Sequence, residues 1–204
     1  MTGAFHGSGA DHGSGGDRVA EAFRAVPRAP FLPVGLRRRA GQDEPLPIGE
    51  GQTNSQPTTV WNMLHLLGVR EGDRVLDVGA GSGWTTALLA QLVGPTGTVL
   101  GIERQASLLG PARGALEAAV PDGRAEIREA RPGVLGAPAD APFDRILVSA
   151  GAHQRPPELV AQLGEDGVMV IPIRGVMHRL VRRGDTVLDT QHGRYLFVPL
   201  VEDG

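Results

Sequence analysis

The stretch from Arg74 to Trp84, RVLDVGAGSGW, decides the fold class of this 204-residue chain. Its first five residues include the apolar Val75, Leu76 and Val78 and end at a glycine-rich turn, which predicts a buried β-strand. Residues 84–93 follow directly and predict a helix. The glycine-rich turn therefore joins a strand to a helix, as in proteins that build a parallel sheet.

The same alternation continues on both sides of this stretch. Helices are expected over 17–26, 57–67, 108–120 and 157–163, and further strands over 98–102, 125–128, 145–149 and 167–172. This order predicts an α/β, Rossmann-like fold with a mostly parallel sheet and helices on both faces. Residues 178–200 predict short strands joined by turns, which form an antiparallel edge at the C-terminal end of the sheet.

The chain is expected to be one domain over residues 17–204. Residues 1–16 carry six glycines and few apolar side chains, so they predict a flexible tail. Residues 17–70 would supply an N-terminal helix, a long loop and a second helix, and residues 71–204 the cofactor-binding sheet. The proline-rich loop over 27–57 has no sustained period, and its length makes it the first candidate for substrate contact.

Composition narrows the possible partners. Twenty basic and 23 acidic residues give a net charge of −3, which offers no general field for nucleic acid. The chain has no cysteine, which removes disulfides and thiolate chemistry, and we expect no metal site. No apolar run reaches the roughly 18 residues of a membrane helix, so a cytoplasmic location without membrane binding is expected.

The glycine-rich turn has the geometry of a nucleotide site. Gly79, Gly81 and Gly83 permit close backbone approach, and the helix that follows presents free N–H groups. Glu103 closes the second strand of this unit twenty residues after Gly83, where a carboxylate can accept both ribose hydroxyls. The alternative interpretation is a glycine turn that only packs the helix on the strand.

Two residues indicate which nucleotide-type ligand the loop would bind. A dinucleotide fingerprint places its third glycine one position later, where this chain has the bulky Trp84, so NAD is disfavoured. Asp77 directs a carboxylate toward the loop, which would repel a pyrophosphate and attract the ammonium group of S-adenosylmethionine. Ser82 is assigned first to capping the helix, and Trp84 is assigned to the core.

Several motifs make the chain resemble the protein-L-isoaspartate O-methyltransferase family over roughly residues 19–201. The matching motifs are VPRAPFLP (26–33), PLPIGEGQTNSQP (45–57), VLDVGAGSGW (75–84), APFDRILV (141–148), ELVAQL, VMVIPI and the closing FVPL. The resemblance implies a seven-stranded class I methyltransferase fold and S-adenosylmethionine as the methyl donor. It also implies methylation of an isoaspartyl α-carboxyl in damaged peptides or proteins, after which the ester closes to a succinimide.

The resemblance also implies site residues. Thr53 and Ser55 would be the catalytic residues, beside the transferred methyl and the substrate carboxylate. Substrate-binding residues would be Gln52, Asn54, Gln56 and Pro57. Cofactor-binding residues would be Asp77, Gly79, Ala80, Gly81, Ser82, Gly83, Glu103 and Arg104. A carboxylate is already ionised at pH 7, so no catalytic base is needed. Ser55 has a second interpretation, as the N-cap of the helix that begins near Gln56-Pro57.

Two departures from the family leave alternatives open. The family's G-D-G triplet, whose aspartate accepts from adenine, is replaced here by Arg131-Pro132-Gly133. The family's first helix has no counterpart ahead of residue 17. One alternative is a dedicated methyltransferase that acts on an ordinary aspartate of a ribosomally made precursor peptide and forms an aspartimide. A second is a catalytically weak cofactor- or peptide-binding module. A monomer is expected in each case.

Overall fold

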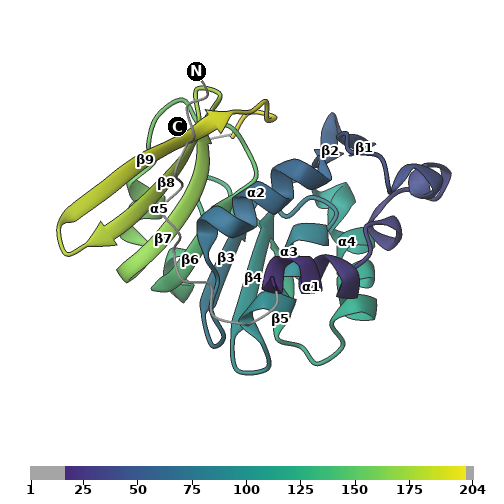
Figure 1. Ribbon diagram of the computed structural model, residues 1–204, viewed down its shortest axis with the longest axis horizontal. Helices are drawn as coiled ribbons and strands as arrows, with labels where there is room; N and C mark the ends of the chain where they lie inside the picture. The colour runs from purple at the N-terminus through teal and green to yellow at the C-terminus, as the bar shows by residue number, and fades with distance from the viewer. Residues whose placement is uncertain (1–16, 201–204) are drawn as a thin grey trace, which may run out of the picture.

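A seven-stranded sheet forms the centre of the computed structural model, which describes residues 17–200 (Figure 1). The predicted tail over 1–16 lies outside the described residues. The strand order is β5-β4-β3-β6-β7-β8-β9. The bounds are β3 Arg74–Val78, β4 Thr98–Glu103, β5 Ala125–Glu129, β6 Phe143–Val148, β7 Leu163–Ile173, β8 Val176–Arg183 and β9 Thr186–Arg194. The first five strands in this order pair in parallel. β8 pairs antiparallel with β7, and β9 pairs antiparallel with β8, as the sequence predicts for this edge.

Helices cover both faces of the sheet, but unequally. The helices are α1 Arg18–Ala25, α2 Pro57–Leu67, α3 Trp84–Val93, α4 Ala106–Ala119 and the short α5 Pro157–Ala161. The first four contribute to one apolar core, which includes Val75 and Leu147 of the sheet. The opposite face carries a second core, to which α5 contributes Leu159. Alternate residues of β3 enter the two cores, as a strand covered on both sides requires.

The segment between α1 and α2 has more structure than the loop predicted for it. It contains the 3₁₀ turns η1 Ala29–Phe31 and η2 Val34–Arg39, and an antiparallel hairpin of β1 Leu46–Gly49 and β2 Gln52–Asn54. A further 3₁₀ turn, η3 Pro138–Asp140, precedes β6. The hairpin turn places Glu50 and Gly51 at φ 52° and 69°. Glutamate is uncommon at a positive φ, so the sequence carries no standard hairpin signal here.

The assignment of Ser82 to capping is wrong, and so is the second interpretation of Ser55 as an N-cap. Gly83, with φ 84°, occupies the N-cap of α3, and Ser82 makes no cap hydrogen bond there. Gln56 occupies the N-cap of α2, and it too has no side-chain cap bond. Asp43 instead caps α2 from the preceding loop, because its carboxylate accepts from the backbone N–H of Thr58 at 2.8 Å. Ser55 is therefore not needed to start α2.

Within residues 17–200, none of the helices combines the length and the apolar composition that crossing a membrane requires.

Candidate active site

A cavity of about 1360 Å³ opens at the carboxyl ends of the parallel strands. Residues that follow β3, β4, β5 and β6 line it, together with the β1–β2 hairpin and the chain after β9. The strand order reverses between β3 and β6, since β4 lies on one side of β3 and β6 on the other. Open α/β sheets bind ligands at this kind of topological switch point.

The glycine loop lines the cavity and is held to the neighbouring strand. The N–H groups of Gly79 and Ala80 both donate to the carbonyl oxygen of Ile102, at 2.9 and 3.1 Å. Gly83 serves packing, because a Cβ atom on it would lie 3.0 Å from Ile127 Cδ1 and 3.2 Å from the carbonyl oxygen of Ala112. Its φ of 84° also disfavours any other residue.

Glu103 is buried at the end of β4, with 5% of its surface exposed, and it lines the cavity. One carboxylate oxygen accepts from the N–H of Gly81 at 2.7 Å, and the other accepts from the N–H of Gln105 at 2.8 Å. These two bonds fix the orientation of the carboxylate. A carboxylate has about four lone-pair sites, so acceptor capacity remains for ligand hydroxyls.

Asp77 lies beneath the glycine loop and is not part of the cavity wall. One of its oxygens accepts from the hydroxyl of Thr86 at 2.7 Å, whereas the other is buried without a hydrogen-bond partner. Burial raises the pKa of Asp77 to about 7, with a smaller contribution from the negative charge of Glu103. The loop thus lies over a carboxylate that is incompletely satisfied, which favours a cationic group nearby.

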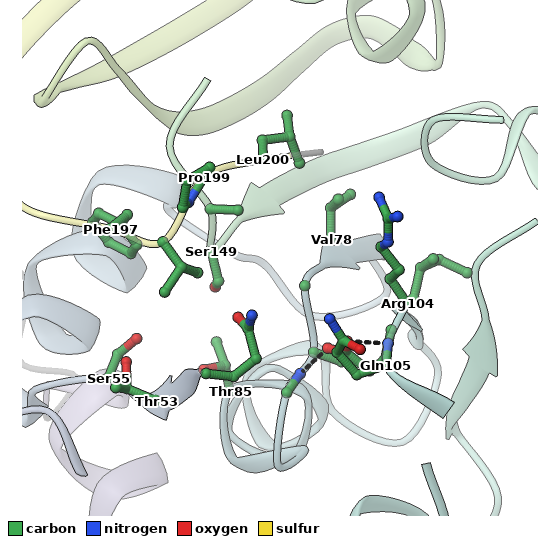
Figure 2. Close-up of a pocket in the computed structure, with 18 of the residues that line it drawn as sticks. Thr53, Ser55, Val78, Thr85, Arg104, Gln105, Ser149, Phe197, Pro199 and Leu200 are labelled. Atoms are coloured by element: carbon green, nitrogen blue, oxygen red, sulfur yellow. Dashed lines mark hydrogen bonds between the residues drawn. The ribbon is translucent and has the colours of Figure 1, made fainter. Parts of the chain in front are cut away.

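Thr53 and Ser55 lie on one side of the cavity, and Arg104 and Gln105 on the opposite side (Figure 2). Thr85 is seen between the two groups. The hydroxyls of Thr53 and Ser55 and the strand end at Glu103 therefore line one shared space. A ligand that contacts the strand end could place a reactive group near the hydroxyls.

A segment that the sequence analysis did not assign to the site forms a further part of the wall. Phe197, Pro199 and Leu200 lie along a further side of the cavity (Figure 2). Backbone hydrogen bonds between Gly151 and both Val198 and Leu200, each 2.8 Å, hold this segment beside the chain that follows β6. Its only sequence signal is the closing FVPL motif, because the segment has no apolar period.

Most of the predicted site residues meet in this one cavity. Those that line it are Gln52, Thr53, Asn54, Ser55, Gln56, Gly79, Ala80, Gly81, Ser82, Glu103 and Arg104. Three do not: Asp77 lies below the loop, Gly83 packs against α4, and Pro57 is the first residue of α2. Within residues 17–200 no group of acidic or histidine side chains could hold a metal ion.

The residues after β5 form another part of the wall. Glu129, Arg131, Pro132 and Gly133 all line the cavity and are exposed. The N–H of Val134 donates to the carbonyl oxygen of Arg131 at 3.1 Å, which closes a tight turn. Proline has no N–H and no polar side chain, so Pro132 offers a ligand neither a donor nor a side-chain acceptor.

These features define a Rossmann-like, class I methyltransferase. S-Adenosylmethionine fits the site, since Glu103 presents an oriented carboxylate and the unpartnered oxygen of Asp77 lies beneath the loop. A Cβ atom on Gly81 would approach Ile48 at 3.3 Å, so glycine also keeps this part of the loop open.

Comparison with known proteins gives the family. Residues 10–204 match the family model for protein-L-isoaspartate(D-aspartate) O-methyltransferase. A Methanopyrus kandleri protein named protein-L-isoaspartate O-methyltransferase is 45% identical over 194 residues, which cover 92% of this chain and 85% of that protein. A protein of the same name from Ignicoccus hospitalis is 40% identical over 190 residues, 91% of this chain and 89% of the relative. The chain belongs to the protein-L-isoaspartate O-methyltransferase family.

A solved structure agrees with this assignment. It comes from Plasmodium falciparum and is described as a protein-L-isoaspartate O-methyltransferase in complex with S-adenosyl-L-homocysteine. Its TM-score is 0.82 at 25% identity, and the similarity covers 91% of each chain. The predicted seven-stranded methyltransferase fold is confirmed, and the family uses S-adenosylmethionine as its cofactor.

Proposed function

We propose that this chain catalyses the S-adenosylmethionine-dependent O-methylation of isoaspartyl carboxylates in peptides or proteins. The family match over nearly the whole chain supports this reaction. Thr53 and Ser55 lie on the wall of the cavity that the glycine loop also lines, and this position is the observation that supports assigning the reaction to them. A cytoplasmic location and a monomeric state belong to the same proposal.

The cofactor would be held by the glycine loop and Glu103. Glu103 would accept from the ribose hydroxyls while its two backbone bonds keep it oriented. Asp77 would balance the positive charge of the methionine part through the loop. When bound, S-adenosylmethionine supplies an electrophilic methyl group on a sulfonium.

The substrate carboxylate would be the nucleophile. It is ionised at pH 7, so a new O–CH₃ bond forms as the S–CH₃ bond breaks, and no proton has to move. The protein's task is then to orient one carboxylate oxygen and to exclude water. The hydroxyls of Thr53 and Ser55 would donate to the carboxylate, and the apolar side chains of Phe197 and Leu200 would shield the reacting atoms. The methyl ester then closes to a succinimide with loss of methanol.

Methyl transfer from a labelled donor tests this proposal. The protein is incubated with S-adenosylmethionine labelled in the methyl group and with a short isoaspartyl peptide. A twin peptide with alanine at that position is the control. We expect base-labile label in the isoaspartyl peptide and none in the twin. Label in neither peptide, from protein that binds S-adenosyl-L-homocysteine, would contradict the proposed substrate.

A further inference from the structure

Arg28 is a buried arginine whose side-chain hydrogen bonds go to one segment of the chain. Only 5% of its surface is exposed, and it does not line the cavity. Its guanidinium donates to Asn54 Oδ1 at 2.6 Å and to four backbone carbonyl oxygens. These belong to Gln42 at 3.1 Å and to Glu44, Asn54 and Ser55, each at 2.9 Å. One side chain thus holds residues 42–55, the segment that carries Thr53 and Ser55.

The guanidinium is itself fixed from behind. It lies over the ring of Trp84, 5.5 Å from the ring centroid, at the start of α3. The indole N–H of Trp84 donates to the carbonyl oxygen of Val26 at 3.1 Å, which ties the ring to the chain two residues before Arg28. Arg28 therefore connects the segment 42–55 to the helix that follows the glycine loop.

Asn54 extends this connection into the glycine loop. Its side-chain oxygen accepts from Arg28, and its side-chain nitrogen donates to the hydroxyl oxygen of Ser82 at 2.9 Å. Asn54 is 4% exposed, so water competes weakly for these bonds. The neighbouring N–H of Gly81 is bound to Glu103. Hydrogen bonds thus link the side of the cavity with Ser55 to the side with the acidic strand end.

We propose that Arg28 is a positioning residue for methyl transfer, which through Asn54 and Ser82 sets the distance between the hydroxyl-bearing segment 42–55 and the glycine loop. The inference rests on the proposed function, because it takes Thr53 and Ser55 as the residues that meet the substrate carboxylate. An error of about 1 Å in such a geometry can cost about 100-fold in rate.

Lysine cannot replace the guanidinium in this role. Arginine offers five N–H donors in a rigid plane, whereas lysine offers three donors on one flexible ammonium. Arg28→Lys keeps the positive charge and removes the planar set of N–H donors. Asn54→Leu keeps the approximate size and breaks the link between Arg28 and Ser82, while it leaves the buried charge in place.

Arg145 is a matched control for the loss of a buried guanidinium. It is 6% exposed and donates to the carbonyl oxygens of Gly68 and Asp144, but it lies on β6 and outside the cavity wall. Burial lowers the pKa of both Arg28 and Arg145. Arg145→Lys should lower stability without changing the rate per folded molecule.

Hydrogen–deuterium exchange tests, without the methyl-transfer reaction, whether Arg28 and Asn54 hold segment 42–55 in place. In Arg28→Lys and Asn54→Leu, amide exchange in fragments that cover 42–56 should rise by about tenfold or more, while β4 keeps its protection. Calorimetry with S-adenosyl-L-homocysteine counts the molecules with a folded cofactor site. Unchanged exchange in 42–56 in both variants would overturn the inference, whatever the activity.

Kinetics on an isoaspartyl peptide test whether this holding supports methyl transfer. Per cofactor-binding molecule, kcat/KM should fall about 10- to 100-fold in Arg28→Lys and Asn54→Leu, mainly through kcat, and should not change in Arg145→Lys. Equal losses in all three variants, or normal kcat/KM in the first two, would overturn the positioning role. If the native protein methylates no isoaspartyl peptide, the proposed function fails. The exchange data then still test, independently of activity, whether Arg28 and Asn54 hold segment 42–55 in place.

Discussion

The carboxylate of Glu103 accepts a hydrogen bond from the backbone N–H of Gly81 at 2.7 Å. The end of β4 is thereby joined to the glycine loop that follows β3. Because the second carboxylate oxygen accepts from Gln105, both oxygens are oriented before any ligand binds. Because the Glu103 side chain is already oriented, it loses little conformational entropy when a ligand binds, so Glu103 is suited to recognise a ribose.

Replacing Glu103 should therefore weaken cofactor binding. In Glu103→Ala, the charged acceptor and the support of the loop are both lost, and the cost should be about 1–3 kcal/mol, roughly 5- to 150-fold in Kd. Titration calorimetry with S-adenosyl-L-homocysteine measures this directly. An unchanged Kd in a folded variant would contradict the ribose-binding role.

Ser55→Ala should reduce turnover without reducing stability. The helix cap belongs to Asp43, so loss of the Ser55 hydroxyl removes no cap bond, and the melting temperature should change little. If the hydroxyl orients the substrate carboxylate, kcat/KM should fall by about 10-fold or more, since such hydrogen bonds are charge-assisted. A normal kcat/KM would show that Ser55 only lines the cavity.

Asp17→Ala provides the opposite control. Asp17 caps α1, where its carboxylate accepts from the N–H groups of Val19 and Ala20, and it does not line the cavity. Its loss should cost about 1 kcal/mol of stability and leave the rate per folded molecule intact. Together the two variants separate stability from turnover.

The sheet could be predicted because its strands and helices carry regular apolar patterns. The β1–β2 hairpin could not, since its strands are short and its turn uses Glu50 at a positive φ. The cap of α2 comes from Asp43, fifteen residues before Thr58, and no local rule connects the two. For Asp77, the pattern RVLDV predicts a buried strand but cannot tell whether the carboxylate reaches a ligand or Thr86.

Asp77 should make the stability of the ligand-free protein fall as pH rises. Its pKa is about 7 in the folded state, against an ordinary value of 3.8, because it is buried. Between these two values the folded state binds a proton that the unfolded state has lost, so each step up in pH favours unfolding. Asp77→Asn removes this titration. The free energy of unfolding, measured from pH 4 to 8, should therefore decline more steeply in the native protein, and parallel profiles would contradict the raised pKa.

Adenine should be recognised loosely. Pro132 lines the cavity after β5 and offers no side-chain acceptor for the adenine amino group. An S-adenosyl-L-homocysteine analogue that lacks the adenine amino group should lose less than about fivefold in affinity, because no buried acceptor is left unpaired. A large loss that Glu129→Leu abolishes would assign the contact to Glu129, which lines the same wall.

The central claim concerns the substrate, and a pair of peptide isomers tests it most directly. One peptide contains isoaspartate and the other an ordinary aspartate in the same sequence, and kcat/KM for methyl transfer is measured on both. We expect methylation of the isoaspartyl peptide, at least about tenfold faster than that of its aspartyl twin. Efficient methylation of the aspartyl peptide, with none on the isoaspartyl twin, would contradict isoaspartate methylation and favour a dedicated enzyme that forms an aspartimide in a precursor peptide.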